Sequence, residues 1–382
     1  MRFRAGLTFA VAVALVLAAC GKDSSERSER RRAATTTTTT PRAVGPQTVP
    51  VPAPPPAPPT TGPPPAVTVP PGAPRSTTTT STPATTTRPT TEPTVTAAAP
   101  TSRPGATSTT TKPKPVTRKT VVYSPTGAPK RQGDLVLPRQ HENTIVVLVH
   151  GGDGSTGTRK QMRGWADFYA QHGYPSFAID YLLAKPTTPP PVSPKPETDV
   201  KAAVQYLRGR AAELTVDPDR IVVQGFATGA ALSAQAEVTP DDPFFGGNSR
   251  YPSVTDKPAA FIGFYGRYDG AVRNPTRYYG GPPGSTDPTV QARHAKANSI
   301  AHAVDAAGPA LLVQGDADEP ALVESATKFH DALQAAGKDA TLTVVPGAGA
   351  GFDQSKSGAL TPAGQQVAQQ VLEWLGARFP PS

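Results

Sequence analysis

Few side chains in this sequence could do chemistry on a substrate, and apart from one cysteine they follow residue 140. Thr228 carries a hydroxyl inside a sharp glycine-flanked turn, GFATG at 225–229. Asp316, Asp318 and Glu319 fall within four residues of one another, so their carboxylates could hold a cation through oxygen ligands. Six histidines could supply a general base: His141, His150, His172, His294, His302 and His330.

Each of these groups also has a structural explanation. A threonine at the start of a helix commonly caps the local backbone. Adjacent acids on a turn after a strand are more often solvated or helix-capping than metal ligands, and no HExxH-like spacing occurs. We therefore expect no metal and no cofactor.

The only cysteine is Cys20. A globular part without cysteine has no disulfide, no thiolate metal site and no cysteine nucleophile. Residues 1–20 read MRFRAGLTFAVAVALVLAAC, a positive start followed by an apolar stretch too short to span a bilayer. LAAC at 17–20 resembles the lipobox of bacterial lipoproteins, which implies cleavage before Cys20 and a diacylglyceryl group on its thiol.

A Thr/Pro-rich tract follows, and it has almost no large apolar side chains to bury. We expect 1–19 to be a signal peptide, 20–117 a disordered tether anchored at Cys20, and 118–382 one folded domain. The net charge of +9 belongs to the leader and tail, because residues 1–117 hold 13 Lys/Arg and four acids while the rest holds 25 of each. A nucleic-acid partner is therefore not expected.

The elements that must position these residues alternate between short β-branched runs and amphipathic stretches. This alternation predicts a mostly parallel central sheet with helices on both faces, an α/β fold. We expect strands at 145–149, 175–181, 220–224, 259–264, 310–314 and 341–345, and helices at 159–172, 197–214, from 228, at 320–336 and at 362–377. The stretches 238–258 and 265–305 are expected to be irregular lid segments.

Four stretches, in order and spacing, resemble the α/β-hydrolase fold and especially its small esterase branch, including acetyl-xylan esterase-like enzymes. They are HGG at 150–152, the run 199–225 leading into GFATG, LLVQGDAD at 311–318, and VVPGAGAGFD at 344–353. The resemblance covers about 230 residues and implies a serine nucleophile, a histidine base and an acid. It also implies an oxyanion hole from Gly151, Gly152 and the backbone N–H of Thr228.

The chain departs from that pattern at two of the three triad positions. In the G-x-S-x-G turn the nucleophile position is Ala227, and in the G-x-x-H-G-F loop the histidine position is Ala350. Only the acid remains, as Asp318. Loss of serine or histidine from a triad costs about 10⁶ in turnover, and loss of both costs little more, because they act as a unit.

Three alternatives would restore chemistry or binding. Thr228 could act as a relocated nucleophile, and His294 or His302 of the 265–305 segment could replace the missing base. Seven aromatic residues near the expected mouth could form a rim for planar or sugar ligands, or could simply pack the lid loops. They are Phe244, Phe245, Tyr251, Tyr265, Tyr268, Tyr278 and Tyr279.

The sequence thus predicts a lipid-anchored protein on the extracytoplasmic face of the cell membrane, with an esterase-like domain used for binding or as a scaffold. The expected partners are the membrane, through the anchor, and a cell-wall or small acyl or sugar ligand. The alternative is an active carboxylic-ester hydrolase that works with non-standard residues.

Overall fold

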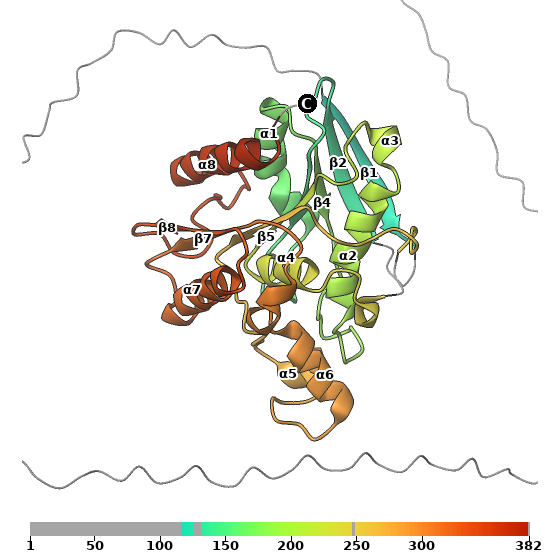
Figure 1. Ribbon diagram of the computed structural model, residues 1–382, viewed down its shortest axis with the longest axis vertical. Coiled ribbons are helices and arrows are strands. Elements are labelled where there is room, and N and C mark those ends of the chain that lie inside the picture. Colours follow the sequence, from blue (N-terminus) through green and yellow to red (C-terminus); the bar gives the residue numbers. More distant parts are fainter. Residues whose placement is uncertain (1–115, 126–130, 247–248, 381–382) are drawn as a thin grey trace, which may run out of the picture. The chain divides into compact units, whose positions relative to one another are not determined.

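An eight-stranded sheet forms the centre of the computed structural model, which describes residues 116–125, 131–246 and 249–380. Its strands lie in the order β1-β2-β4-β3-β5-β6-β7-β8 (Figure 1). β1 and β2 pair antiparallel, as do β2 and β4, and all other neighbours are parallel. The strands are β1 (Val116–Ser124), β2 (Arg131–Pro138), β3 (Ile145–Val149), β4 (Ser176–Ile179), β5 (Ile221–Phe226), β6 (Ala260–Phe264), β7 (Ala310–Gly315) and β8 (Ala340–Val345).

Helices cover both faces of the sheet, with α1 and α8 on one face and α2, α4 and α7 on the other (Figure 1). The α-helices are α1 (Arg163–Gln171), α2 (Lys195–Arg208), α3 (Ala211–Leu214), α4 (Thr228–Val238), α5 (Pro275–Tyr279), α6 (Pro288–Ala297), α7 (Pro320–Ala335) and α8 (Pro362–Arg378). The described residues also form the 3₁₀ helices η1 (Arg159–Met162), η2 (Pro243–Phe245) and η3 (Ile300–Asp305). Within the described ranges, none of these helices is both long and apolar enough to span a bilayer.

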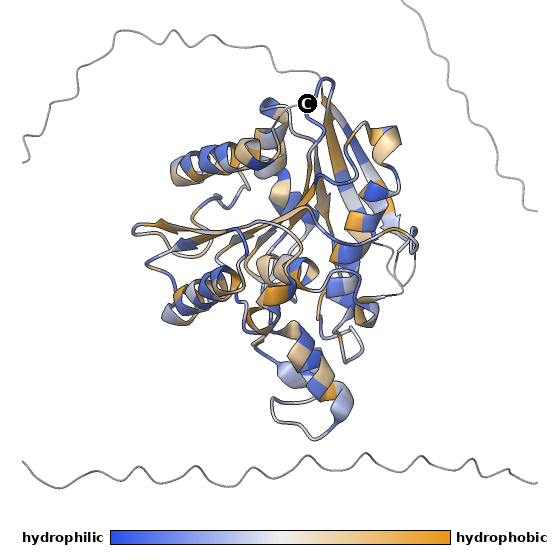
Figure 2. Cartoon of the chain, in the orientation of Figure 1, coloured by the Kyte–Doolittle hydropathy of each residue, from blue (hydrophilic) through white to orange (hydrophobic). Residues whose placement is uncertain are grey.

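Two hydrophobic cores follow from the alternation of side chains along the buried strands. In β3, Ile145, Val147 and Val149 pack into the core under α2, α4 and α7. Val146 and Leu148 pack into the opposite core, with α1 and α8. A parallel strand buried on both faces reads as a continuous apolar run, which is why IVVLV predicted it correctly. Figure 2 agrees with this, since the central strands are mostly hydrophobic and the helices carry both hydrophobic and hydrophilic residues.

The expected α/β-hydrolase architecture is confirmed, and the expected strands are present with bounds that differ by at most two residues. Two antiparallel strands at one end of the sheet, the edge strand β1 and its neighbour β2, were not predicted. β1 begins at Val116, two residues inside the stretch assigned to the tether. The helix expected over 197–214 is two helices: α2 ends at Arg208 with Gly209 as its C-cap, and α3 begins at Ala211. An added Cβ at Gly209 would lie 2.5 Å from the ring of Tyr251. The leader, Cys20 and nearly all of the expected tether lie outside the described residues.

The segment 265–305 is an ordered insertion, so the expectation of irregular structure there is wrong. It forms α5, α6 and η3, and it is held on the loop that precedes α2. The backbone N–H groups of Val192 and Ser193 donate to Tyr278 O at 3.0 and 2.9 Å. Arg277 donates to three carbonyl oxygens of the same loop, those of Ala184, Lys185 and Thr188.

The other long segment, 238–258, is fixed to α2 by buried charge. Lys201 is 2% exposed and donates to the carbonyl of Thr239 and to Asp256 Oδ1, the latter at 2.9 Å. Asp256 in turn accepts the backbone N–H of Asp241 at 2.8 Å. A buried ammonium paired with a carboxylate and a carbonyl makes this segment part of the body.

Candidate functional site

The candidate site is centred on Ala227, in the turn between β5 and α4. Ala227 has φ 48° and ψ −115°, a backbone conformation that costs a non-glycine residue about 1–3 kcal/mol. The strand enters the turn and the helix leaves it at once, the strained strand–turn–helix geometry typical of a nucleophile elbow. The backbone N–H of Ala227 donates to Phe264 O, at the end of the neighbouring strand β6, at 3.0 Å.

Two glycines allow this sharp turn because the backbones meet there. An added Cβ at Gly225 would lie 2.1 Å from Gly229 O, and one at Gly229 would lie 2.2 Å from Val149 O. Real Cβ contacts are essentially never that short, so any other residue would push α4 away from β3 and β5. The G-x-x-x-G spacing in the sequence therefore predicted the geometry of the turn correctly.

The predicted oxyanion loop lies directly against this turn. An added Cβ at Gly151 would lie 3.2 Å from the Cβ of Ala227 and 3.0 Å from Phe226 O. One at Gly154 would lie 3.6 Å from the Cγ2 of Thr228. Gly152 has φ 116°, and a Cβ there would lie 2.4 Å from Thr156 O. Since Thr228 is the first residue of α4, its N–H has no acceptor within the helix. The structure thus brings Gly151 and Thr228 to the same turn, with Gly152 next to Gly151.

His150 holds the predicted oxyanion loop in place. It is 1% exposed, its Nδ1 lies 2.7 Å from Gly151 O, and its ring stacks on Tyr181 with centroids 4.4 Å apart. Burial lowers the pKa of His150, so the ring is neutral around pH 7. The hydroxyl of Tyr181 donates to His150 O at 3.0 Å, which closes the arrangement. His150 therefore holds the loop and is not positioned as an exposed base.

Asp318, the predicted remnant acid, lies after the end of β7 and is half-buried. Its Oδ2 accepts from Gln314 Nε2 at 2.9 Å, and its Oδ1 accepts the backbone N–H of Glu319 at 2.8 Å. Both carboxylate oxygens thus have protein donors without a histidine.

The loop that carries Ala350 is packed onto the same turn after β7. Asp316 Oδ1 accepts the N–H of Gly347 at 2.6 Å, and the N–H of Ala317 donates to Ala348 O at 3.0 Å. Ala350 itself is exposed. The predicted acid position and the predicted histidine position therefore belong to two adjoining turns at one edge of the sheet.

A buried carboxylate that the sequence did not reveal, that of Asp353, anchors the loop that carries Ala350. Asp353 is fully buried and accepts from Trp165 Nε1 and from the hydroxyl of Tyr265, both at 2.7 Å. Tyr265 follows β6 with φ 39°, and burial beside Asp353 raises the pKa of its hydroxyl well above its usual range. Phe352 packs against Tyr265, with ring centroids 6.1 Å apart. These contacts tie the Ala350 loop to α1 and to the strand end beside Ala227.

The other candidate residues have roles within the fold. The ring of His294 packs on Tyr279 with centroids 4.2 Å apart, and its Nε2 lies 3.0 Å from Gly281 O. His302 contacts Ala295 O and lies 3.6 Å from Asp305, so both histidines have their contacts inside the insertion. In the described part of the chain, no group of three or more His, Cys, Asp or Glu residues is placed to hold a metal ion.

The aromatic residues expected near the mouth mostly pack the interior, and the packing interpretation holds for five of the seven. Each of those five is at most 8% exposed: Phe245, Tyr265, Tyr268, Tyr278 and Tyr279. Phe244 and Tyr251 are half-buried. These aromatic residues therefore do not form a rim that is open to a sugar.

Comparison with known proteins agrees with this geometry. The BD-FAE family model matches residues 134–333, a stretch that includes Ala227 and Asp318 and ends before Ala350. Esterase LipC of Mycobacterium tuberculosis is 30% identical over 220 residues, which is 55% of this chain and 53% of LipC. The probable carboxylic ester hydrolase LipM of the same organism is 29% identical over 126 residues, 33% of this chain and 28% of LipM. The chain thus spans about half or less of the length of these relatives.

Solved esterase structures share the fold. The butyrate-bound esterase Est2 of Thermogutta terrifontis has a TM-score of 0.58 and 21% sequence identity, covering 69% of this chain and 96% of that one. Its native form gives a TM-score of 0.57, also at 21% identity, covering 68% and 92%. With its mostly parallel eight-stranded sheet, its strained turn after β5 and this family match, the chain belongs to the BD-FAE family of the α/β-hydrolase superfamily.

Proposed function

We propose that this esterase-like domain has lost its catalytic triad and serves as a non-catalytic binding or scaffold protein. The observation that carries the proposal is the methyl group of Ala227 at the one strained turn where this fold presents a nucleophile. A methyl group has no lone pair and cannot form a covalent acyl intermediate.

The state of Asp318 supports the same proposal. In an active triad the acid accepts a hydrogen bond from the base and fixes its orientation. Here the two oxygens of Asp318 accept from Gln314 and from the N–H of Glu319, and the loop position expected for the base is the exposed Ala350. An oxyanion hole acting alone would leave only about 10³–10⁴-fold catalysis over water.

The place where the protein acts is the second part of the proposal. The leader with its lipobox-like LAAC at 17–20 anchors the chain by a lipid on Cys20, at the extracytoplasmic face of the cell membrane. The Thr/Pro-rich stretch that follows separates the anchor from the folded domain, so the domain can meet a cell-wall or small acyl or sugar ligand. An attached diacylglycerol gives stable membrane attachment, which a single acyl chain does not.

A repair experiment tests the proposed loss. The variant with both Ala227→Ser and Ala350→His should hydrolyse p-nitrophenyl acetate or butyrate at least about 10²-fold faster than the wild-type chain, because serine and histidine act as a unit. Each single variant is the matched control and should remain near the wild-type rate for the same reason. Circular dichroism and thermal unfolding would establish that all three variants fold.

The opposite results are equally clear. Wild-type turnover clearly above the uncatalysed rate and within tenfold of the double variant would contradict the proposal. If that turnover disappeared in Thr228→Ala, the alternative would hold, namely an active carboxylic-ester hydrolase with a relocated nucleophile. A folded double variant without activity would mean that the pocket no longer admits small esters, as expected for a site adapted to binding.

A further inference from the structure

A second candidate site lies on the sheet face covered by α1 and α8, apart from the turn at Ala227. It is a groove of about 710 Å³ between α1, α8 and the segment 357–360. None of its lining residues belongs to the oxyanion loop, the β5–α4 turn, the Asp318 turn or the Ala350 loop. A volume of this size is in the usual range for small-molecule sites.

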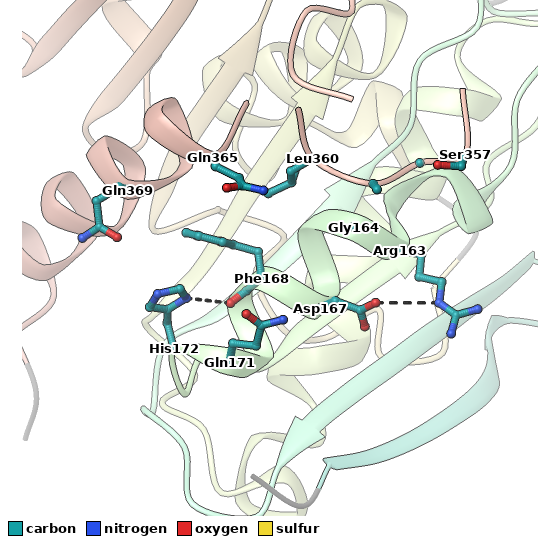
Figure 3. Close-up of a pocket in the computed structure, with 12 residues that line it drawn as sticks. Arg163, Gly164, Asp167, Phe168, Gln171, His172, Ser357, Leu360, Gln365 and Gln369 are labelled. Atoms are coloured by element: carbon teal, nitrogen blue, oxygen red, sulfur yellow. Dashed lines mark hydrogen bonds and ion pairs between the residues drawn. The ribbon is translucent and has the colours of Figure 1, made fainter. Parts of the chain in front are cut away.

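The floor of the groove is apolar and is fixed by backbone contact. Figure 3 shows Phe168 between the two helices, with Leu360 from the opposite side near it. The ring of Phe168 packs against His172, with ring centroids 4.4 Å apart, and against Trp165, with ring centroids 6.1 Å apart. An added Cβ at Gly164 would lie 2.1 Å from Gly358 O, so α1 and the segment 357–360 meet backbone to backbone.

The rim carries three carboxamides whose donors and acceptors have no protein partner in the described part of the chain. The rim carboxamides are Gln171 on α1 and Gln365 and Gln369 on α8 (Figure 3). All three are exposed, and their side chains have no hydrogen bond within the part of the chain that the structure describes. His172 Nδ1 lies 2.8 Å from Phe168 O, which leaves Nε2 for another partner.

One guanidinium and one carboxylate line the groove, those of Arg163 and Asp167. Arg163 lies 3.7 Å from Asp167, so the guanidinium and the carboxylate at this end offset one another. Asp167 also pairs with Arg118 of β1. An anionic ligand such as a phosphate would meet the Asp167 carboxylate together with the cations, so a neutral ligand fits the groove better.

We propose that this groove binds a neutral glycan chain. A carboxamide both donates and accepts hydrogen bonds, as does a sugar hydroxyl, and three carboxamides line the groove. The C–H face of a pyranose ring matches the apolar floor made by Phe168 and Leu360. This site is separate from the one at Ala227, and it does not depend on whether the triad is lost.

The test is calorimetric titration of the full-length chain with three neutral tetrasaccharides, the β-1,4-linked oligomers of glucose, xylose and N-acetylglucosamine. The double variant Gln365→Ala with Gln369→Ala should weaken binding of the preferred tetrasaccharide at least tenfold. The matched control is Gln366→Ala with Gln370→Ala, the same change on the same helix at exposed positions outside the groove. It should bind within twofold of the wild-type chain.

Two outcomes would overturn the proposal: no binding of any of the three sugars at millimolar concentration, or equal affinity in the two double variants. The repair variant at Ala227 and Ala350 should keep the wild-type glycan affinity. A change there would place the sugar at the strained turn instead, and would contradict a separate groove without bearing on the triad.

Discussion

Ala227 is held at φ 48° by its surroundings, although its side chain is only a methyl group. Glycine has no Cβ to clash at positive φ, so Ala227→Gly should raise the free energy of unfolding by about 1 kcal/mol. Chemical denaturation of both proteins would measure this. Ala231→Gly, within helix α4 and also half-buried, is the control and should lower stability by about 1 kcal/mol. A loss at Ala227 equal to the loss at Ala231 would mean that the turn is unstrained.

At the scale of residues, short local patterns carried the prediction well. GFATG predicted a sharp turn because both glycines are needed for close backbone contact, and the structure has that contact at Gly225 and Gly229. HGG predicted a loop that reaches the turn, and Gly151 does so. The network around Asp353 could not be predicted, because Trp165 and Tyr265 come from elements 188 and 88 residues away in the chain.

Among the elements, α4 carries a buried acid whose ionisation should make folding depend on pH. Glu237 is fully buried and its Oε1 accepts the N–H of Gly308, and burial raises its pKa to about 7. Between pH 4.5 and 7 the folded chain therefore holds a proton that the unfolded chain releases, so stability falls as pH rises through this window. Glu197 is also buried, with its pKa raised to about 7, and it adds a second decrease in stability over the same pH window.

Glu237→Gln should remove the first of these contributions. The variant's free energy of unfolding relative to wild type should rise by on the order of 3 kcal/mol between pH 5 and pH 8. Urea unfolding at several pH values would measure the difference. Glu373→Gln on the exposed side of α8 is the control and should give a constant offset. A difference for Glu237→Gln that stays constant with pH would mean that the buried carboxyl ionises as it does in the unfolded chain.

The elements that the sequence predicted are those with a continuous apolar run, such as β3 and β5, or with helical periodicity, such as α7. The insertion was missed because its helices are short, yet each carries a readable start signal. Asn274 before Pro275 and Asp287 before Pro288 are N-caps followed by proline, and both side chains accept a backbone N–H of the first turn. β1 was missed because its first half, 117–120, is a run of four exposed polar residues at a sheet edge, without the alternation of apolar and polar residues that marks a strand.

At the scale of the whole molecule, the proposed membrane anchor depends on a lipid attached to Cys20. Cys20→Ala should abolish incorporation of a clickable fatty acid and should move the protein from the membrane fraction into the soluble fraction after cell lysis. The reason is that no other cysteine is present to take the diacylglyceryl group. Ser24→Ala, a change of similar size just beyond the lipobox, is the control and should leave membrane association unchanged. Membrane association that persists in Cys20→Ala would rule out the lipid as the anchor.

The most direct test of the central claim is reaction with a fluorophosphonate, which labels activated serine nucleophiles. The wild-type chain should show no mass increase after incubation, while the folded variant with Ala227→Ser and Ala350→His should gain one adduct, located by peptide mapping at position 227. A stoichiometric adduct on the wild-type chain that persists in Thr228→Ala would contradict the account, because the domain would then hold an activated nucleophile elsewhere.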